Sequence, residues 1–172
     1  MEELVILVNE KDEVLGEMPK LEAHEKGVLH RAFSVFIFND AGQMMMQKRA
    51  DEKYHSPGLW SNTCCSHPRL NETNVEAGER RLQEEMGFTV PLKHIFSFVY
   101  RAEFGNGLIE HELDHVLIGQ YNEEPKINLN EVGAWDWVEV SELIKDMEEK
   151  PERFTFWFKN LMTEYLDRIE TK

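Results

Sequence analysis

The sequence has few of the residues that mark secreted or membrane proteins. Its only two cysteines, Cys64 and Cys65, are neighbours. Their side chains diverge in an extended chain, so an ordinary disulfide between them is geometrically poor. No apolar run approaches the length of a membrane span, and acidic residues stand near the N-terminus where a signal peptide would carry lysines. These absences predict free thiols and a cytoplasmic protein with no membrane partner.

Positive charge is also scarce. The 172 residues include 19 Lys and Arg against 33 Asp and Glu, which gives a formal net charge of −14. A surface of that sign repels phosphate backbones, so we expect no nucleic-acid partner, and an anionic ligand needs a local basic pocket or a metal. The length and the 41% hydrophobic content fit one compact domain over residues 1–172. We expect a monomer or a weak homodimer.

The order of expected elements is rich in strands. Strands are expected at residues 3–9, 14–20 and 134–140, a short helix at 21–30 that stops at Gly27, and hairpins at 31–50 and 94–121. The clearest helix is 71–88, because Thr73 and Glu76 have capping-box spacing and Gly87 stands where helices commonly end. Two further helical stretches flank Pro151. This order predicts an α/β or α+β fold with mixed sheets covered by helices.

The stretch "WSNTCCSHPRL" places a cysteine and a histidine two residues apart. In an extended segment side chains alternate, so Cys65 and His67 face one way while Cys64 and Ser66 face the other. Three interpretations are open: a metal-binding corner, a nucleophile, or a buried pair of thiols without chemistry. A lone cysteine near a lone histidine also fits a small apolar residue beside a hydrogen-bonded ring.

Two carboxylates show the same alternation in "LIEHELDHVLIGQY". Glu110 and Glu112 share one face of the expected strand, with His111 and Leu113 on the other, and Tyr100 on the partner strand can reach the same region. Like charges this close repel and raise each other's pKa unless a cation lies between them. We therefore expect a metal or a proton at this pair.

Histidines in "LEAHEKGVLH" are candidates for further ligands. His24 and His30 do not have the spacing of a helical metal pair, so they converge only if the chain bends at Gly27. Together with His67, Glu110 and Glu112 they would form a nitrogen and oxygen site suited to Mn, Zn or Fe.

The charged helix at 71–88 has two interpretations. Arg81 and Glu85 lie one turn apart, which fits a solvated surface held by ion pairs. The wider pattern is similar to the Nudix box, whose R-E-U-x-E-E-x-G-U core is matched at Arg80, Leu82, Glu84, Glu85, Gly87 and Phe88, with Glu72 at the upstream acidic position. Two positions depart from the box: Ser66 replaces its leading glycine, and Arg81 replaces a glutamate with which Nudix hydrolases hold magnesium.

These motifs, together with "LHRAF", "YRAEF" and "FTFWF", resemble the type 1 isopentenyl diphosphate isomerases of the Nudix superfamily over nearly the whole chain. The resemblance implies Nudix-like mixed β-sheets sandwiched between helices. It implies a small-molecule isoprenoid diphosphate as substrate. It also implies interconversion of isopentenyl and dimethylallyl diphosphate through a tertiary carbocation, in isoprenoid biosynthesis.

The resemblance also assigns roles to residues. The implied catalytic residues are Cys65, Glu112, Tyr100 and Trp157. The implied ligands of Mn²⁺ or Zn²⁺ are His24, His30, His67, Glu110 and Glu112. The implied diphosphate-binding residues are Lys20, Arg49, Lys53 and Arg81, with Glu85 helping to hold Mg²⁺. In the forward direction the Glu112 and Tyr100 side would deliver a proton and a Cys65 thiolate would remove one, while the Trp157 indole faces the cation.

Two alternatives remain open at the level of sequence. A Nudix hydrolase of a diphosphate substrate would keep the glutamate that Arg81 replaces, because hydrolysis needs carboxylates to load magnesium. A non-catalytic metal-binding module would leave the basic set unexplained. No role is assigned to His55, His94, His111 and His115.

Overall fold

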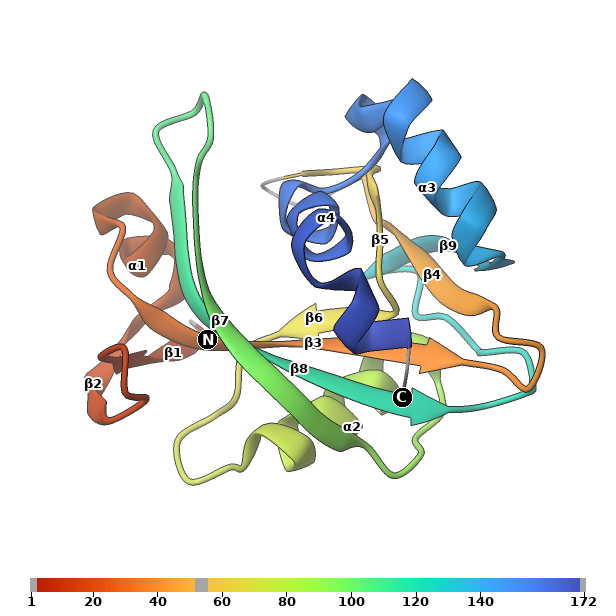
Figure 1. Ribbon diagram of the computed structural model, residues 1–172. Coiled ribbons are helices and arrows are strands. Elements are labelled where there is room, and N and C mark those ends of the chain that lie inside the picture. The colour runs from red at the N-terminus through yellow and green to blue at the C-terminus, as the bar shows by residue number, and fades with distance from the viewer. Residues whose placement is uncertain (1–2, 52–55, 171–172) are drawn as a thin grey trace.

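The computed structural model describes residues 3–51 and 56–170 (Figure 1). The strands over these residues are β1 (Leu4–Val8), β2 (Val14–Pro19), β3 (His30–Phe38), β4 (Met44–Arg49), β5 (Trp60–Ser61), β6 (Cys64–Ser66), β7 (Lys93–Glu103), β8 (Ile109–Gln120) and β9 (Val132–Val138). The helices are α1 (Lys20–Lys26), α2 (Asn74–Met86), α3 (Val140–Glu149) and α4 (Phe156–Glu170), with a 3₁₀ turn η1 (Pro151–Arg153) before α4.

Strand β3 is the centre of the mixed sheet. It pairs in parallel with β8, with His30 opposite Glu112, and β8 pairs antiparallel with β7. On its other side β3 pairs antiparallel with β6, where Ser34 lies opposite Cys65. This arrangement brings the ends of several segments, far apart in sequence, to one place on the sheet.

Two apolar clusters cover the two faces of the sheet. Phe36 packs with Phe158 and other residues of α3, α4 and β7, whereas the neighbouring Val35 and Ile37 pack with Leu82 and other residues of α2. Both faces of β3 are therefore buried, which explains its nearly continuous apolar sequence. Helix α4 lies over one face and α2 over the other (Figure 1). The predicted fold class is confirmed.

The ends of two helices follow the predicted signals. Helix α2 has a capping box in which Thr73 Oγ1 accepts from the Glu76 amide and Glu76 Oε1 accepts from the Thr73 amide. It ends at Gly87, whose φ is 74°. Helix α1 ends at Gly27 with φ 69°, and the chain turns there into β3. The left-handed conformation at both glycines costs little without a Cβ.

The two expected hairpins have different outcomes. Residues 94–121 form a long hairpin of β7 and β8, with a bulge between His94 and Phe96. Residues 31–50 pair only at the tip, through Phe38 and Met44, because β3 then pairs with β6 and β8 while β4 pairs with β5 and β9. No helix in the described part of the chain is long and apolar enough to cross a membrane.

Candidate active site

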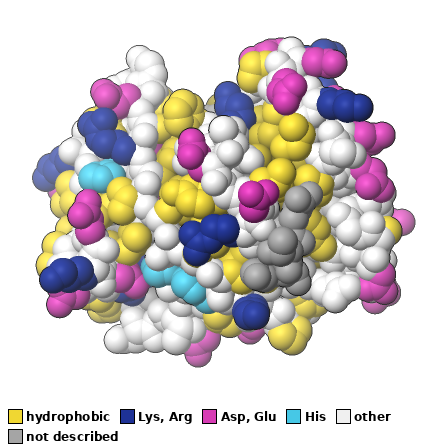
Figure 2. All heavy atoms as spheres, in the orientation of Figure 1, with side chains coloured by type: hydrophobic (Ala, Val, Ile, Leu, Met, Phe, Trp, Pro, Cys, Tyr) yellow, Lys and Arg dark blue, Asp and Glu magenta, His cyan; other side chains and the backbone are white. Residues whose placement is uncertain are grey.

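A polar cavity of about 190 Å³ opens beside β3, β6 and β8. Residues predicted as site residues that line it are Lys20, Arg49, Cys65, His67, Arg81, Glu85, Glu110, Glu112 and Trp157. The space-filling view of one face shows basic, acidic and histidine side chains gathered near its middle, with hydrophobic side chains between them (Figure 2). Lys53 and His55 lie outside the described residues.

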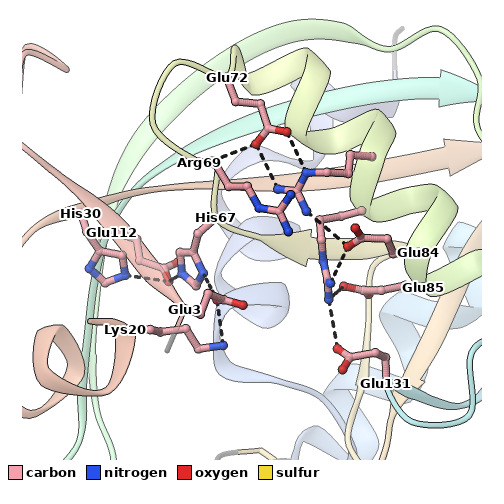
Figure 3. Close-up of polar contacts among 12 residues, drawn as sticks. Glu3, Lys20, His30, His67, Arg69, Glu72, Glu84, Glu85, Glu112 and Glu131 are labelled. Atoms are coloured by element: carbon pink, nitrogen blue, oxygen red, sulfur yellow. Dashed lines mark hydrogen bonds and ion pairs between the residues drawn. The ribbon is translucent and has the colours of Figure 1, made fainter. Parts of the chain in front are cut away.

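Four side chains converge beside this cavity. One donor atom each from His24, His30, His67 and Glu112 lies within 4.8 Å of the others. Glu112 Oε2 is 3.4 Å from His30 Nε2 and 3.2 Å from His67 Nε2 (Figure 3). Helix α1 and the Gly27 bend bring His24 to the start of β3, where the parallel pairing sets His30 against Glu112. The convergence expected from a bend at Gly27 is present.

The orientation of these histidines fits a cation site. His30 Nδ1 lies 2.9 Å from the Val28 carbonyl, so this nitrogen donates to the carbonyl, and the buried Nε2 points at Glu112. His67 Nδ1 lies 3.6 Å from the carboxylate of Glu3 while its Nε2 faces Glu112. Metal-binding histidines commonly donate their second ring nitrogen to a carbonyl or carboxylate in this way. Imidazole nitrogens together with one carboxylate suit Mn²⁺ or Zn²⁺.

Electrostatics leave His24 neutral and Glu112 charged in this cluster. Burial, together with the charges of His67 and His30, lowers the pKa of His24 to about 3, so its imidazole stays neutral. Burial opposes the charge on Glu112, but hydrogen bonds from His30 and His67 outweigh it and hold the pKa of this carboxyl well below its usual range. Glu112 is therefore ionised.

Glu110 has the opposite electrostatic environment. Burial and the neighbouring charge of Glu112 raise the pKa of the Glu110 carboxyl well above its usual range. The proton expected at this pair is therefore favoured on Glu110, because two histidines stabilise the charge of Glu112. Glu110 also lies outside the four groups within 4.8 Å of one another. Tyr100 is opposite Glu112 on β7, and burial, with the Glu110 charge, raises the pKa of its phenol.

The two cysteines face opposite sides, as the alternation predicts. Cys64 is fully buried in the cluster under α2. Cys65 lines the cavity, where its Sγ lies 3.2 Å from Trp157 Nε1, 3.1 Å from Asn62 Oδ1 and 3.6 Å from Ser34 Oγ. Burial, together with the nearby charge of Asp114, raises the pKa of Cys65 to about 12. This environment therefore favours the thiol form of Cys65 over the thiolate.

Arg81 is engaged by carboxylates on three sides. Its guanidinium lies 2.5 Å from Glu85, 2.8 Å from Glu84 and 3.0 Å from Glu131. The other oxygen of Glu85 accepts a hydrogen bond from Gln47 at 2.9 Å. The carboxylates of the Nudix-like helix are thus held by protein groups, and Arg81 still lines the cavity.

The other cationic groups border the cavity at separate points. Lys20 Nζ forms an ion pair with Glu3 at 3.2 Å, and the Arg49 guanidinium lies 5.2 Å from the centre of the Trp157 ring. A cation at this distance from an indole is attracted by the ring electrons. Both side chains line the same cavity as Cys65.

Several cavity or site-adjacent residues were missed by sequence reasoning. Glu3, Ser34, Gln47 and Asn62 line the cavity, and buried Asp114 accepts a hydrogen bond from Ser34 at 2.8 Å. Asp114 continues the alternation of Glu110 and Glu112 on β8, so the period of two could have revealed it. Nothing in the local pattern around Glu3 indicates that it reaches the site.

Three of the histidines without an assigned role lie away from the cluster. His111 Nδ1 contacts the Gly27 carbonyl at 3.1 Å. His94 Nε2 lies 2.9 Å from His115 Nδ1, and His115 Nε2 lies 3.3 Å from Asp12. The first contact ties β8 to the bend between α1 and β3, and the other two tie β7 and β8 to the turn between β1 and β2.

Comparisons with known proteins agree with this geometry. The NUDIX domain family model matches residues 28–158. The isopentenyl-diphosphate Delta-isomerase 2 of Aromatoleum aromaticum is 51% identical over 169 residues, which cover 98% of this chain and 87% of that protein. The isopentenyl-diphosphate Delta-isomerase 2 of Photorhabdus laumondii is 48% identical over 162 residues, covering 94% of this chain and 92% of that protein.

Solved structures show the same fold at low identity. A crystal structure of a Deinococcus radiodurans protein has a TM-score of 0.77 and 21% identity, covering 95% of this chain and 99% of that one. The MutT protein from Methanosarcina mazei Go1 has a TM-score of 0.66 and 16% identity, covering 81% and 94%. The chain therefore belongs to the NUDIX domain family and, within it, to the family of the isopentenyl-diphosphate Delta-isomerases.

Proposed function

We propose that this protein is an isomerase that interconverts isopentenyl diphosphate and dimethylallyl diphosphate. The observation that carries the proposal is one cavity lined by a thiol, a buried carboxylate and an indole, namely Cys65, Glu112 and Trp157. Relatives at about half identity carry the name of this activity. The fold alone would not select it, since one fold hosts many functions.

The proposed chemistry needs one proton added and one removed. Moving a double bond in an unactivated alkene adds a proton at one carbon, which gives a tertiary carbocation, and removes a proton from another. The pKa of Cys65 is raised and that of Glu112 is lowered, so Cys65 carries a proton and Glu112 a negative charge. Cys65 can therefore donate a proton while Glu112 accepts one. Because the reaction is reversible, the two groups exchange roles in the reverse direction. Tyr100 assists on the Glu112 side.

The carbocation requires a dry surrounding without a competing nucleophile. Trp157 is 95% buried and borders the cavity, where a desolvated indole stabilises a cation by about 2 kcal/mol. The neutral thiol of Cys65 beside it is a weaker nucleophile than a thiolate. These two groups therefore favour charge stabilisation over covalent trapping.

The histidine cluster is proposed to hold a divalent cation, Mn²⁺ or Zn²⁺. His24, His30, His67 and Glu112 would be its ligands, and we assign Glu110 to the same set from the sequence. A cation bound there supplies positive charge beside Glu112, which offsets the repulsion between the two buried carboxylates. Glu112 is thereby held in place next to the substrate carbon.

The diphosphate is proposed to lie against the basic side of the cavity. Lys20, Arg49 and Arg81 line it, and we assign Lys53 to the same set from the sequence. Glu85 is proposed to help hold Mg²⁺ on the diphosphate. We also propose that the protein acts in the cytoplasm, on a small-molecule isoprenoid diphosphate.

A hydrolase remains the chief alternative, and Arg81 argues against it. A Nudix hydrolase needs several carboxylates that can load magnesium, but here Arg81 stands in place of one of them and binds another, Glu84. Arginine is suited to bind an anion and unable to ligate a cation. This geometry favours keeping the diphosphate intact.

The experiment is proton and phosphorus NMR of the protein with isopentenyl diphosphate, Mg²⁺ and Mn²⁺ in deuterated water. We expect dimethylallyl diphosphate with deuterium incorporated and both phosphates retained. Cys65→Ala should abolish conversion, whereas the matched variant Cys64→Ala should keep it, because Cys64 faces α2. Release of phosphate or a monophosphate would identify a hydrolase and overturn the proposal.

A further inference from the structure

Two polar residues of the cysteine and tryptophan motifs have no role in the chemistry above. Asn62 and Thr155 are both fully buried. Asn62 stands three residues before Cys65, and Thr155 stands two residues before Trp157. A buried amide or hydroxyl is costly unless it is hydrogen-bonded, so the partners of these side chains indicate what they do.

The orientation of the Asn62 amide is fixed by the backbone. Its Nδ2 donates to the carbonyl oxygens of Val35 at 2.9 Å and Cys64 at 3.1 Å. Only the NH₂ end of an amide can donate to carbonyls, so Oδ1 must face the other way. There Oδ1 accepts from Ser61 Oγ at 2.8 Å and from Cys65 Sγ at 3.1 Å.

A second set of bonds reaches Ser61 and Trp60 from Thr155, the residue before helix α4. Thr155 Oγ1 donates to Ser61 Oγ at 3.2 Å, and the Thr155 amide donates to the Trp60 carbonyl at 3.0 Å. The Thr155 carbonyl accepts from the Lys159 amide at 3.1 Å, which ties Thr155 to the first turn of α4. The position of that turn is therefore linked to Asn62 through Ser61.

One more hydrogen bond joins Trp157 to Cys65, the two groups proposed to act on the substrate. Trp157 Nε1 donates to Cys65 Sγ at 3.2 Å, although the two residues lie 92 positions apart in the chain. The order of contacts is Cys65, Asn62, Ser61, Thr155, the first turn of α4, Trp157 and again Cys65. We call these five residues the hydrogen-bonded ring. It joins β6 to α4 across the cavity.

We propose that Asn62, Ser61 and Thr155 are positioning residues that set the Cys65 thiol and the Trp157 indole at one fixed separation beside the substrate. The inference rests on the proposed function for what the two groups do, but the ring itself is independent of it. Proton transfer and cation stabilisation must act on neighbouring carbons of one small substrate. A displacement of about 1 Å in such a site can lower the rate by about 10²-fold.

The first test removes one hydroxyl at the far end of the ring. Thr155→Val keeps the shape and loses the bond to Ser61, and Thr155→Ser restores the hydroxyl. We expect Thr155→Val to lower kcat about 10- to 100-fold with KM within about twofold, and Thr155→Ser to recover most of kcat. Thr163→Val makes the same substitution at an exposed site of α4 and should leave kcat unchanged.

The second readout does not depend on activity. The indole N–H signal of Trp157 in a ¹H–¹⁵N spectrum can be assigned with Trp157→Phe. In Thr155→Val this signal should shift and exchange faster with solvent, and Cys65→Ala should change it in the same sense, because the indole loses its sulfur acceptor. This result is expected even if isopentenyl diphosphate is not the substrate.

A double-mutant cycle separates a shared ring from independent effects. Asn62→Ala should lower kcat at least as much as Thr155→Val, and the double variant should lose little more than Asn62→Ala alone, because both act through one network. If Thr155→Val lowers only the unfolding midpoint, with kcat and the Trp157 signal unchanged, the ring is structural and the proposal is wrong. Additive losses in the double variant would also overturn it.

Discussion

The histidine cluster predicts that a divalent cation stabilises the folded protein through a defined set of side chains. His24, His30, His67 and Glu112 are close enough to share one ion, and the same ligands are scattered when the chain unfolds. A ligand that binds only the folded state at a hundred times its Kd stabilises it by about 2.7 kcal/mol. For a domain of this size, Mn²⁺ should therefore raise the midpoint of thermal unfolding by about 5–11 °C over the protein in EDTA.

Removing one ligand should reduce this gain by a calculable amount. Loss of a group that only orients a ligand weakens metal affinity about 10- to 100-fold, and we take that as the least effect of His67→Ala. At the same Mn²⁺ concentration, the stabilisation should then fall from about 2.7 to about 0.4–1.4 kcal/mol or less. His94→Ala is the control, because His94 contacts His115 and is not part of the cluster.

The assay is differential scanning calorimetry of the three proteins, each with EDTA and with Mn²⁺. The comparison within each protein cancels any direct effect of the substitution on stability. An equal Mn²⁺-dependent shift in wild type and His67→Ala would refute the assignment of this cluster as the cation site. A reduced shift in His94→Ala would show that the ion binds elsewhere.

Three further predictions concern stability and pH. Gly87→Ala should lower the free energy of unfolding, measured in urea, by about 2–5 kcal/mol. The φ of Gly87 is 74°, and an added Cβ would lie 2.3 Å from the Lys126 carbonyl oxygen. A loss below about 1 kcal/mol would contradict this. Arg81→Gln should cost about 3 kcal/mol by leaving buried Glu85 without its cation, and an unchanged denaturation midpoint would show that the pair contributes nothing. Burial lowers the pKa of His115 in the folded protein below 6.5. The neutral ring therefore contributes to the free energy of unfolding above pH 6.5, and this contribution is lost as the pH falls through the folded pKa. His115→Gln should therefore flatten the fall of unfolding free energy between pH 7 and 5 in EDTA, and equal slopes would refute it.

Local chemistry explains what could be predicted from the sequence. The capping box at Thr73 and the left-handed glycine at the end of α2 involve only neighbouring residues, so they appear in the sequence as they do in the structure. The alternation that places Cys65 and His67 on one side follows from the geometry of a strand and needs no knowledge of the partner. This alternation identified Cys65 and His67 as the first candidate site residues.

Pairing between distant segments explains what could not be predicted. The sequence suggests a full hairpin over residues 31–50, but β6 and β8 compete for the edges of β3 and leave only its tip to β4. The charge state of Glu112 also depends on such pairing, because the stabilising His30 reaches it only through the parallel register of β3 and β8. Glu3, the residue before β1, joins the site for the same kind of reason.

The parallel pairing of β3 and β8 has a consequence for the order of folding. Ser34 and Asp114, on these two strands, are 80 positions apart, and pairing at such separations is slow because the chain must close a large loop first. His30 and Glu112 meet only when this pairing is complete. Cation uptake during refolding should thus follow this pairing, and a bound cation should slow unfolding to the extent that its site forms after the transition state.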